Sequence, residues 1–426
     1  MTSASLATPP QRSRPQLGRK FTMLWSASSI SAVGDGMRDS SLPLLALTVS
    51  DSPKAVSLVA VSGSLPWLLM ALFGGVIADR FDRRRLMWTI DIGRAVIVLG
   101  FATWVFLATP PLAALAVLAF VLGCGETVFV NAATSAIPDV VRPDQLDAAN
   151  GRLQGGLLVG RMAGPLVGTT LFALAAGYPF TVDGLSFAAA ASLVFLTGRS
   201  SAPRARAARP VIADIREGVR WLYQHKQLRL VASLSALAGG ASALGITMLA
   251  LLVTRTLSAP TWAYGAVLAS GVIGGTAAST LAGRLSQRLG RRARIALSFV
   301  LMGSALLLMG LSPSVILVAA LFAVGNFGVV TWNVQAISLR QQIVPKELLG
   351  RVNSCYLMLT RIGMLIGAGL SGWIGSAVNV RTPLVISGIL LLAALFALPR
   401  MGNLEPAPAP AAEERPAEEP AEQTAD

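Results

Sequence analysis

The sequence predicts an all-α membrane protein with twelve transmembrane helices in two six-helix halves. Of its 426 residues, 54% are apolar and only 13% are charged, and the mean hydropathy is +0.63. Such a composition cannot supply the charged surface of a soluble protein. Apolar segments of about 20 residues, the length needed to cross a bilayer, recur along the chain. These observations argue against a soluble enzyme, a disordered protein and a secreted disulfide scaffold.

Twelve segments are long and apolar enough to span a bilayer, and they lack the short alternating strands of a transmembrane barrel. In chain order they are 21–46, 55–78, 86–107, 111–137, 146–173, 180–197, 230–254, 261–283, 294–311, 314–339, 349–374 and 379–398. The polar stretch 198–229 separates the half 21–197 from the half 230–398. Within it, apolar residues at helical spacing over 212–223 favour an amphipathic helix on the inner membrane surface. A solvated linker is the alternative.

Basic residues predict which way the chain crosses the membrane. With a cytoplasmic N-terminus, 28 of the 35 Lys and Arg residues fall in inner segments and 3 in outer loops. Membrane proteins carry this excess on the cytoplasmic side, so we predict a multi-pass protein of the inner or plasma membrane with both termini inside. The same sorting explains the net charge of +14 without a nucleic-acid partner.

Both ends of the chain are polar. Residues 1–20 form a cytoplasmic segment without the apolar core and cleavage site of a secretory signal peptide. Residues 399–426 are rich in Pro, Ala and Glu, and we expect them to form a disordered acidic cytoplasmic tail.

The two halves repeat each other. Residues 75–84 align with residues 283–292, and each segment links the second and third spans of its half. Residues 131–146 align with residues 333–348 at a constant offset. Duplicated six-helix halves are typical of secondary transporters, whose substrate site lies between the halves near the membrane midplane.

These motifs resemble those of the major facilitator superfamily over almost the whole chain. The loop after the second span is similar to the superfamily's signature between helices 2 and 3. In the expected places stand Gly75, Asp79, Arg80, Arg83 and Arg84. The resemblance implies that these charges gate the inner side, with Asp139 as a partner of Arg80 or Arg83. The alternative is that the arginines only fix the topology.

The fifth span resembles the signature of proton-coupled drug antiporters. Its residues are Gly151, Gly160, Gly164, Pro165 and Gly168. Glycines four residues apart let helices approach closely, and Pro165 should bend the helix. A second stripe in the eighth span holds Gly271, Gly275, Ser279 and Gly283. Because helices 5 and 8 meet across the halves in this superfamily, we expect the two stripes to face each other. Residues 31–37 and 79–85 resemble the branch of macrolide-efflux proteins and the enterobactin exporter.

Ionisable residues within the spans are the sharpest functional signal. Each costs about 2.5–3.5 kcal/mol on insertion scales, so it should face a partner or an aqueous cavity. They are Asp35, Arg38, Asp39, Asp91, Arg94, Glu126, Arg161, Asp183 and Arg361. All the acids among them lie in the first half. The resemblance places helices 1 and 4 on the central cavity, which favours Asp35 and Glu126 for proton coupling, with Arg161 as a partner.

The remaining charges have more ordinary interpretations. Arg38 and Asp39 lie one turn from Asp35, either as part of the same site or as a structural pair near the outer end. We expect Asp91 and Arg94, three residues apart, to form a local ion pair near the inner end of helix 3. Asp183 is expected to be an exposed or capping carboxylate near the outer end of helix 6.

The resemblance also suggests which residues contact substrate. The candidates are Met37, Arg38, Asn131, Met248, Trp332, Asn333, Gln335 and Arg361. Met and aromatic side chains give an adaptable apolar wall that suits amphipathic molecules. Two arginines, Arg161 and Arg361, would be direct ligands if the substrate were an anionic siderophore, whereas a cationic drug would favour Asp35 and Glu126.

The sequence therefore predicts a monomeric, proton-coupled antiporter that exports small amphipathic molecules such as antibiotics by alternating access. Export of a siderophore or another endogenous metabolite is the alternative, and a non-transporting membrane sensor or scaffold is the alternative of another class. Cys124 and Cys355 lack metal-ligand spacing, and no nucleotide loop or nucleophile constellation is found. We therefore predict neither an enzyme nor a bound metal or cofactor.

Overall fold

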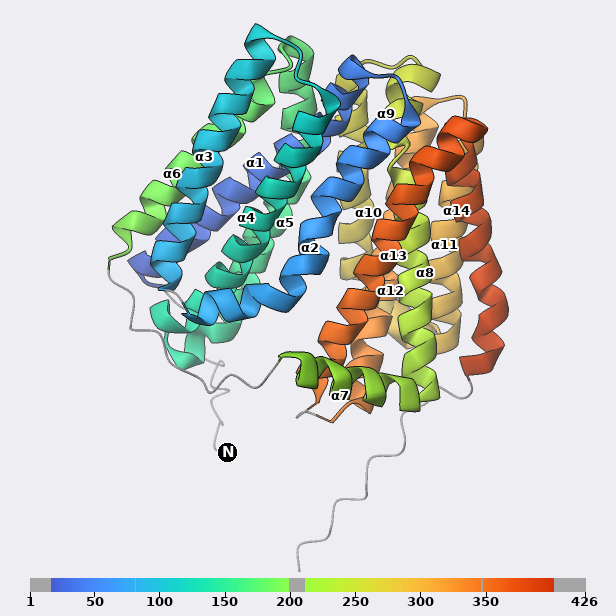
Figure 1. The fold of residues 1–426 in the computed structure, drawn as a ribbon. Coiled ribbons are helices and arrows are strands. Elements are labelled where there is room, and N and C mark those ends of the chain that lie inside the picture. The colour runs from blue at the N-terminus through green and yellow to red at the C-terminus, as the bar shows by residue number, and fades with distance from the viewer. Residues whose placement is uncertain (1–16, 81, 199–210, 346–347, 402–426) are drawn as a thin grey trace, which may run out of the picture.

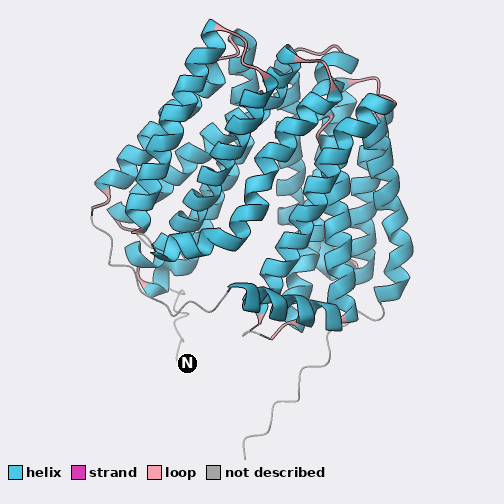
Figure 2. Ribbon diagram, viewed as in Figure 1, coloured by secondary structure: helices cyan, strands magenta, loops and turns pink. Residues whose placement is uncertain are grey.

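The computed structural model describes residues 17–80, 82–198, 211–345 and 348–401. The described residues form long helices joined by short loops, with no strand among them (Figure 2). In lipid a backbone satisfies its own hydrogen bonds within a helix, so long apolar segments fold this way. Most of the N-terminal segment and the acidic tail predicted from the sequence lie outside the described residues.

The first six spans are single helices whose ends lie within three residues of the predicted limits. They are α1 (Arg19–Val49), α2 (Pro53–Arg80), α3 (Arg83–Leu107), α4 (Leu112–Val140), α5 (Leu146–Leu174) and α6 (Tyr178–Leu196), with the short turn η1 (Pro143–Gln145) before α5.

The second six spans follow the helix α7 (Val211–Gln224), and two of them change geometry near one end. They are α8 (Lys226–Ile246) with α9 (Leu249–Leu251) and the π-helical turn η2 (Leu252–Thr256), α10 (Thr261–Arg288), α11 (Arg291–Leu311), α12 (Val315–Ile343), α13 (Leu349–Ala377), and α14 (Thr382–Ala393) with η3 (Ala394–Met401).

Eleven of these spans are long and apolar enough to cross a membrane. The twelfth is α1, which has ample length at 31 residues. Its central charges, Asp35, Arg38 and Asp39, lower its hydropathy. The burial of Arg38 and Asp35 within the bundle explains how such a helix is accommodated. The all-α, twelve-helix fold predicted from the sequence is therefore confirmed.

The helices form two groups that lie side by side (Figure 1). In the first, α1 packs on α5 and α6, α3 packs on α6, and α2 packs on α4. In the second, α8 packs on α13, and α12 packs on α10 and α11. The groups meet mainly where α2 contacts α13 and where α5 contacts α10.

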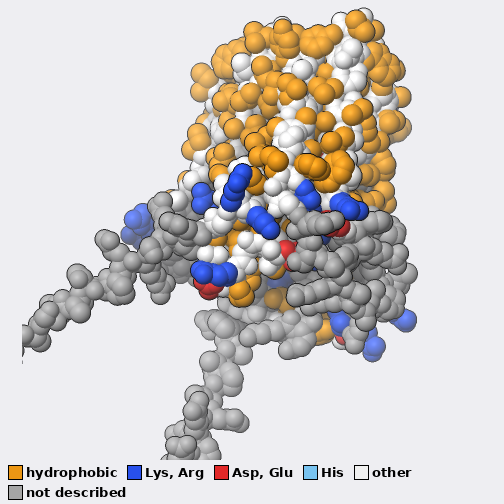
Figure 3. Space-filling view, turned by 90° about the vertical axis from the view of Figure 1, so that its left-hand side faces the viewer, with side chains coloured by type: hydrophobic (Ala, Val, Ile, Leu, Met, Phe, Trp, Pro, Cys, Tyr) orange, Lys and Arg blue, Asp and Glu red, His pale blue; other side chains and the backbone are white. Residues whose placement is uncertain are grey.

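The two ends of the bundle differ in charge. The basic end, as we call it, holds α7 and the helix starts at Arg83, Lys226 and Arg291 (Figure 1). The far end is the opposite one, where α1 ends and α10 begins. In Figure 3, hydrophobic side chains cover most of the upper part of one face, and Lys and Arg side chains gather toward its lower end. This distribution follows the charge pattern that the sequence showed.

Contacts between the two groups lie toward the far end. Ser57 Oγ of α2 donates a hydrogen bond of 2.6 Å to the carbonyl oxygen of Ala368 in α13. Arg255 of η2 forms an ion pair of 2.8 Å with Asp51. Gly265 of α10 lies so close to α5 that a Cβ atom there would be 2.8 Å from the carbonyl oxygen of Pro165. These contacts form a seam that holds the halves together at this end.

The glycine stripes do not face each other, so that expectation is wrong. Cβ atoms at Gly160 and Gly164 would lie 2.6 Å from Ala32 Cβ and 2.7 Å from Gly36 Cα, both in α1. A Cβ atom at Gly271 in α10 would be 2.5 Å from the Phe322 ring in α12. The stripes instead bring helices together within each half, because the small residues face the neighbour that packs most closely.

The predicted amphipathic helix corresponds to α7, which lies across the basic end (Figure 1). Its residues Gly218 and Leu222 are buried, whereas Arg216 and Arg220 are exposed. Glu217 forms an ion pair of 2.5 Å with Arg351 at the start of α13. A helix with one buried and one polar face therefore packs against α13 and α8 of the second half. Its position at the membrane surface remains a prediction.

The α1–α5 contact gives a stability test. A Gly164→Ala substitution should lower the free energy of unfolding by about 1–3 kcal/mol, because the new methyl group overlaps the α1 backbone. Gly155→Ala on the same helix is the matched control, since nothing lies within 4 Å of its Cβ position. Thermal unfolding in detergent micelles measures both. Equal melting temperatures for the two variants would contradict the packing described here.

Candidate functional site

A buried arginine lies at the centre of the first half. Arg38 is 2% exposed. Its Nη1 atom is 2.6 Å from Asp35 Oδ1, and its Nη2 atom is 2.8 Å from Asp39 Oδ1. The same guanidinium is 3.4 Å from Glu126 of α4 and 3.9 Å from Asp183 of α6. One cation thus connects carboxylates from three helices. Because a charge buried without a partner is very costly, these acids are what allows Arg38 to sit there.

A second buried arginine, Arg94 of α3, joins the same cluster. It forms a short ion pair with Asp35 and a longer one of 3.4 Å with Asp91. Its guanidinium lies 3.8 Å from the centre of the Phe187 ring in α6. The expected local pair of Asp91 and Arg94 is present, but it is not isolated, because Arg94 also contacts Asp35 of α1. Asp35 therefore links both arginines.

Asp183 is the clearest correction among the charges. It is 0% exposed, not an exposed or capping carboxylate. Among the described residues, neither of its carboxyl oxygens has a hydrogen-bond partner, and its nearest cation is Arg38 at 3.9 Å. The position of Asp183 near the start of its span suggests an exposed helix end, but its side chain lies on the side of α6 that faces α1. Spacing along one helix does not reveal which neighbour a residue faces.

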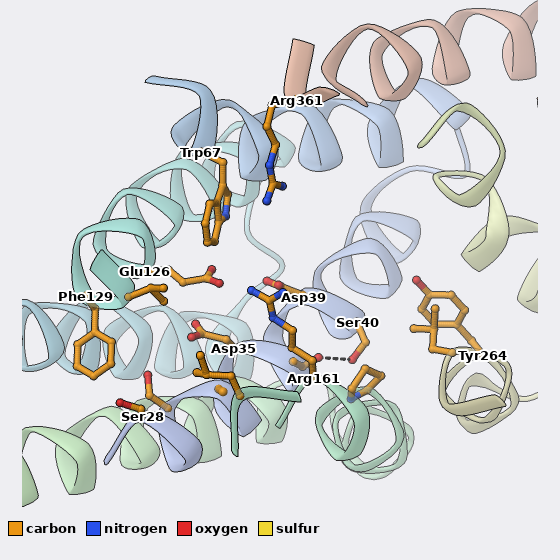
Figure 4. A pocket seen from close by; sticks show the side chains of 17 residues that line it. Ser28, Asp35, Asp39, Ser40, Trp67, Glu126, Phe129, Arg161, Tyr264 and Arg361 are labelled. Carbon is orange, nitrogen blue, oxygen red and sulfur yellow. Dashed lines mark hydrogen bonds between the residues drawn. The ribbon is translucent and has the colours of Figure 1, made fainter. Parts of the chain in front are cut away.

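A cavity of about 380 Å³ lies beside this cluster. It is lined by residues of α1, α2, α4, α5, α10 and α13, so both halves contribute to it. Asp35, Asp39 and Glu126 lie on its wall, with Arg161 and Arg361 reaching into it from other helices (Figure 4). A second cavity of about 270 Å³ is also lined by Arg38. It shares four lining residues with the first: Asp39, Trp67, Glu126 and Arg361.

The cavity walls combine charge with apolar surface. Trp67, Phe129, Leu157 and Leu268 contribute apolar surface, and Tyr264 adds an aromatic ring with a hydroxyl group. Ser28, Ser31 and Ser40 add small hydroxyl groups. Such a site can hold an amphipathic molecule through apolar contact while a few polar groups orient it.

Most of the predicted substrate contacts lie elsewhere. Arg38 and Arg361 line the cavities, but the following residues line neither: Met37, Asn131, Met248, Trp332, Asn333 and Gln335. Met37 and Met248 are at most 3% exposed and pack within the bundle. Trp332 donates a hydrogen bond of 3.1 Å to Ser235, and its ring packs edge-on against Phe299. A Met or Trp within a span is most often a packing residue, and these follow that rule.

The predicted gating loop is described only in part. Arg83 forms an ion pair of 2.9 Å with Asp139, as expected for Arg80 or Arg83. Arg84 donates to the carbonyl oxygen of Val194 at 3.1 Å and to that of Phe195. These contacts tie the start of α3 to the ends of α4 and α6. The side chains of Gly75, Asp79 and Arg80 lie outside the described residues.

The family follows from comparison with known proteins. A family model of the major facilitator superfamily, described as transmembrane secretion effector, matches residues 14–422. The chain belongs to the major facilitator superfamily. It is therefore a membrane transporter and not an enzyme.

Relatives within the superfamily are similar over nearly their whole length. The multidrug efflux pump Tap of Mycolicibacterium fortuitum is 27% identical over 92% of this chain and 98% of that protein. The enterobactin exporter EntS of Escherichia coli O1:K1 is 26% identical over 91% and 94%. A bacterial homologue of the lysosomal transporter Spinster has a TM-score of 0.73 at 16% identity, over 93% of this chain and 100% of that chain.

The two buried carboxyl groups predict different effects on stability. Asp35→Asn should lower the free energy of unfolding by about 2–3 kcal/mol, because Arg38 and Arg94 lose a shared charge partner. Asp183→Asn should change it by less than about 1 kcal/mol, because no hydrogen bond is lost there. Thermal unfolding in detergent compares them. A larger loss for Asp183→Asn would show that the hydrogen-bonding pattern described above is wrong.

Proposed function

We propose that this superfamily member is a proton-coupled antiporter that exports small amphipathic molecules by alternating access. The observation that carries the proposal is the placement of Asp35 and Glu126, which are bound to buried Arg38 and border a cavity that both halves line. Carboxyl groups so placed can exchange protons with the cavity, and each proton changes what Arg38 binds. A sensor or scaffold without transport has no need of a cavity between the halves.

We infer that the basic end faces the cytoplasm, in the plasma membrane. Support comes from the 28 Lys and Arg residues assigned to that side against 3 on the other. The seam at the far end lies beyond the cavity, since Pro165 both lines the cavity and contacts Gly265. Substrate therefore enters from the cytoplasmic side in this conformation, and the seam must separate for release outside.

The two coupling carboxylates have different tasks in this proposal. Asp35 binds both Arg38 and Arg94, so it maintains the cluster in every state. Glu126 meets Arg38 through a single contact of 3.4 Å and lines both cavities. A proton from outside can bind Glu126 and release one contact of Arg38 while the others stay. Arg161, which lines the same cavity, then becomes the partner of Glu126 when the proton leaves.

The cavity suits a range of amphipathic substrates. Trp67, Phe129 and Leu268 offer apolar contact. In the view of Figure 4 the charged side chains lie between Phe129 and Tyr264. The similarity to Tap supports drugs as substrates, whereas the similarity to EntS supports export of a siderophore or another metabolite. Arg161 and Arg361 on the cavity wall favour this second candidate if the molecule is anionic.

Transport in inverted vesicles tests the coupling residues. The assay uses an imposed pH gradient and a panel of drugs and siderophores. Glu126→Gln should lower the rate of gradient-driven uptake at least about tenfold, because one protonatable group is gone. Downhill exchange of the same compound should persist. Asp144→Asn is the control, since Asp144 forms an exposed ion pair with Arg142. Full gradient-driven uptake by both Glu126→Gln and Asp35→Asn would refute the assignment, and uptake of no compound by the wild type would refute export.

Alternating access requires the seam at the far end to open. A Cβ atom at Gly375 of α13 would lie 3.1 Å from Pro53 Cβ of α2, close to the spacing of about 3.5–4.5 Å found in disulfides. In a Cys124→Ser, Cys355→Ser background, the pair Pro53→Cys and Gly375→Cys should cross-link on oxidation and stop transport, and reduction should restore it. Each single cysteine variant serves as the control. Undiminished transport by fully cross-linked protein would contradict a moving seam.

A further inference from the structure

Two arginines approach the central cavity from opposite halves. Arg161 belongs to α5 of the first half, and Arg361 belongs to α13 of the second. Both line the cavity of about 380 Å³, and Figure 4 shows their side chains extending into it from different sides. They are the two cations on this wall, since Arg38 lines only the smaller cavity. A ligand between them would contact both halves at once.

Neither arginine has a charged partner in the described part of the chain. No carboxylate oxygen lies within the 4.0 Å of an ion pair from Arg161 or Arg361 there, and neither guanidinium makes a described hydrogen bond. Arg361 instead lies 4.8 Å from the centre of the Trp67 ring. A guanidinium has five N–H donors in a planar fork, and at these two residues the donors are open to the cavity.

The acids on the same wall are already engaged. Asp35, Asp39 and Glu126 all contact Arg38, and Asp35 also contacts Arg94. A cationic substrate would have to compete with a buried arginine for each of these carboxylates. An anionic substrate would meet donors that have no other partner. The hydrogen-bonding capacity that the cavity offers is therefore greater for an anion.

We propose that Arg161 and Arg361 together bind the anionic head group of the substrate, an inference that rests on the proposed export function. A carboxylate or a similar planar anion accepts paired hydrogen bonds from a guanidinium. Trp67, beside Arg361, and Tyr264 then contact the apolar or aromatic body of the molecule. The substrate class is an amphipathic organic anion whose head group bridges the two halves.

This site is separate from the proton-binding cluster. In this conformation Arg38 and Arg94 hold the coupling carboxylates, whereas Arg161 and Arg361 face the cavity. Because the anion contacts one arginine from each half, its binding favours conformations in which both arginines reach it. The proton binds beside Arg38 and the substrate binds between Arg161 and Arg361. Arg161 connects the two events, because it binds the substrate and pairs with Glu126 when the proton leaves.

Equilibrium binding to the full-length protein in lipid nanodiscs tests the inference with three related fluorescent compounds. Dansylglycine is anionic, dansylamide is neutral and dansylcadaverine is cationic, and all share one aromatic body. Dansylglycine should bind at least about tenfold more tightly than the other two, as expected for charge-assisted hydrogen bonds. Arg161→Gln and Arg361→Gln should each remove most of that preference, and the corresponding Lys variants should keep part of it.

The control variant is Arg288→Gln, which changes an exposed arginine near the end of α10 and should leave the preference unchanged. Thermal unfolding of each variant verifies that it is folded. Equal or tighter binding of dansylcadaverine, binding of none of the three, or a preference that survives both Gln substitutions would overturn the inference. The assay needs no proton gradient, so an arginine-dependent preference without gradient-driven transport would count against the antiporter alone.

Discussion

The structure of the first half depends on the burial of Arg38 in the middle of α1. A charge in this position is tolerated only because Asp35, Asp39 and Glu126 surround it, with Asp183 slightly farther away. These acids come from three helices, so the requirement to neutralise one cation also fixes how α1, α4 and α6 pack. The glycines of α5 then allow α1 to approach closely on its other side.

The described residues of the second half contain no such cluster, and this asymmetry shapes the proposed mechanism. Its helices contribute apolar walls, Tyr264 and Arg361 to the cavity. In the proposed mechanism, proton chemistry is therefore confined to one half, whereas substrate contact is shared. The seam joins the halves at the far end. It includes the hydrogen bond from Ser57 to Ala368 and the ion pair of Arg255 with Asp51. In the proposed mechanism, a change in the ionic contacts of the first half reaches the second half through these contacts.

Much of this could be predicted from the sequence, because burial in lipid constrains it strongly. The twelve helices, the repeat and the charged α1 follow from hydropathy and residue type alone. The side of a helix on which a residue faces its neighbours does not follow from the sequence in this way. Asp183 is expected at an exposed helix end but lies near Arg38. The glycines of α5 are expected to face α10 but face α1. Met37 and Trp332 resembled cavity residues because packing and substrate contact use the same side chains.

In the proposed mechanism, proton movement and substrate movement are obligatorily linked through the Arg38 cluster. The most direct test of this link uses proteoliposomes in weak buffer with a pH-sensitive dye inside and no initial pH difference. An outward gradient of a transported compound should acidify the interior, and the Glu126→Gln protein should move the compound without this pH change. Passage of the compound through the wild-type protein with no change in internal pH would contradict the account.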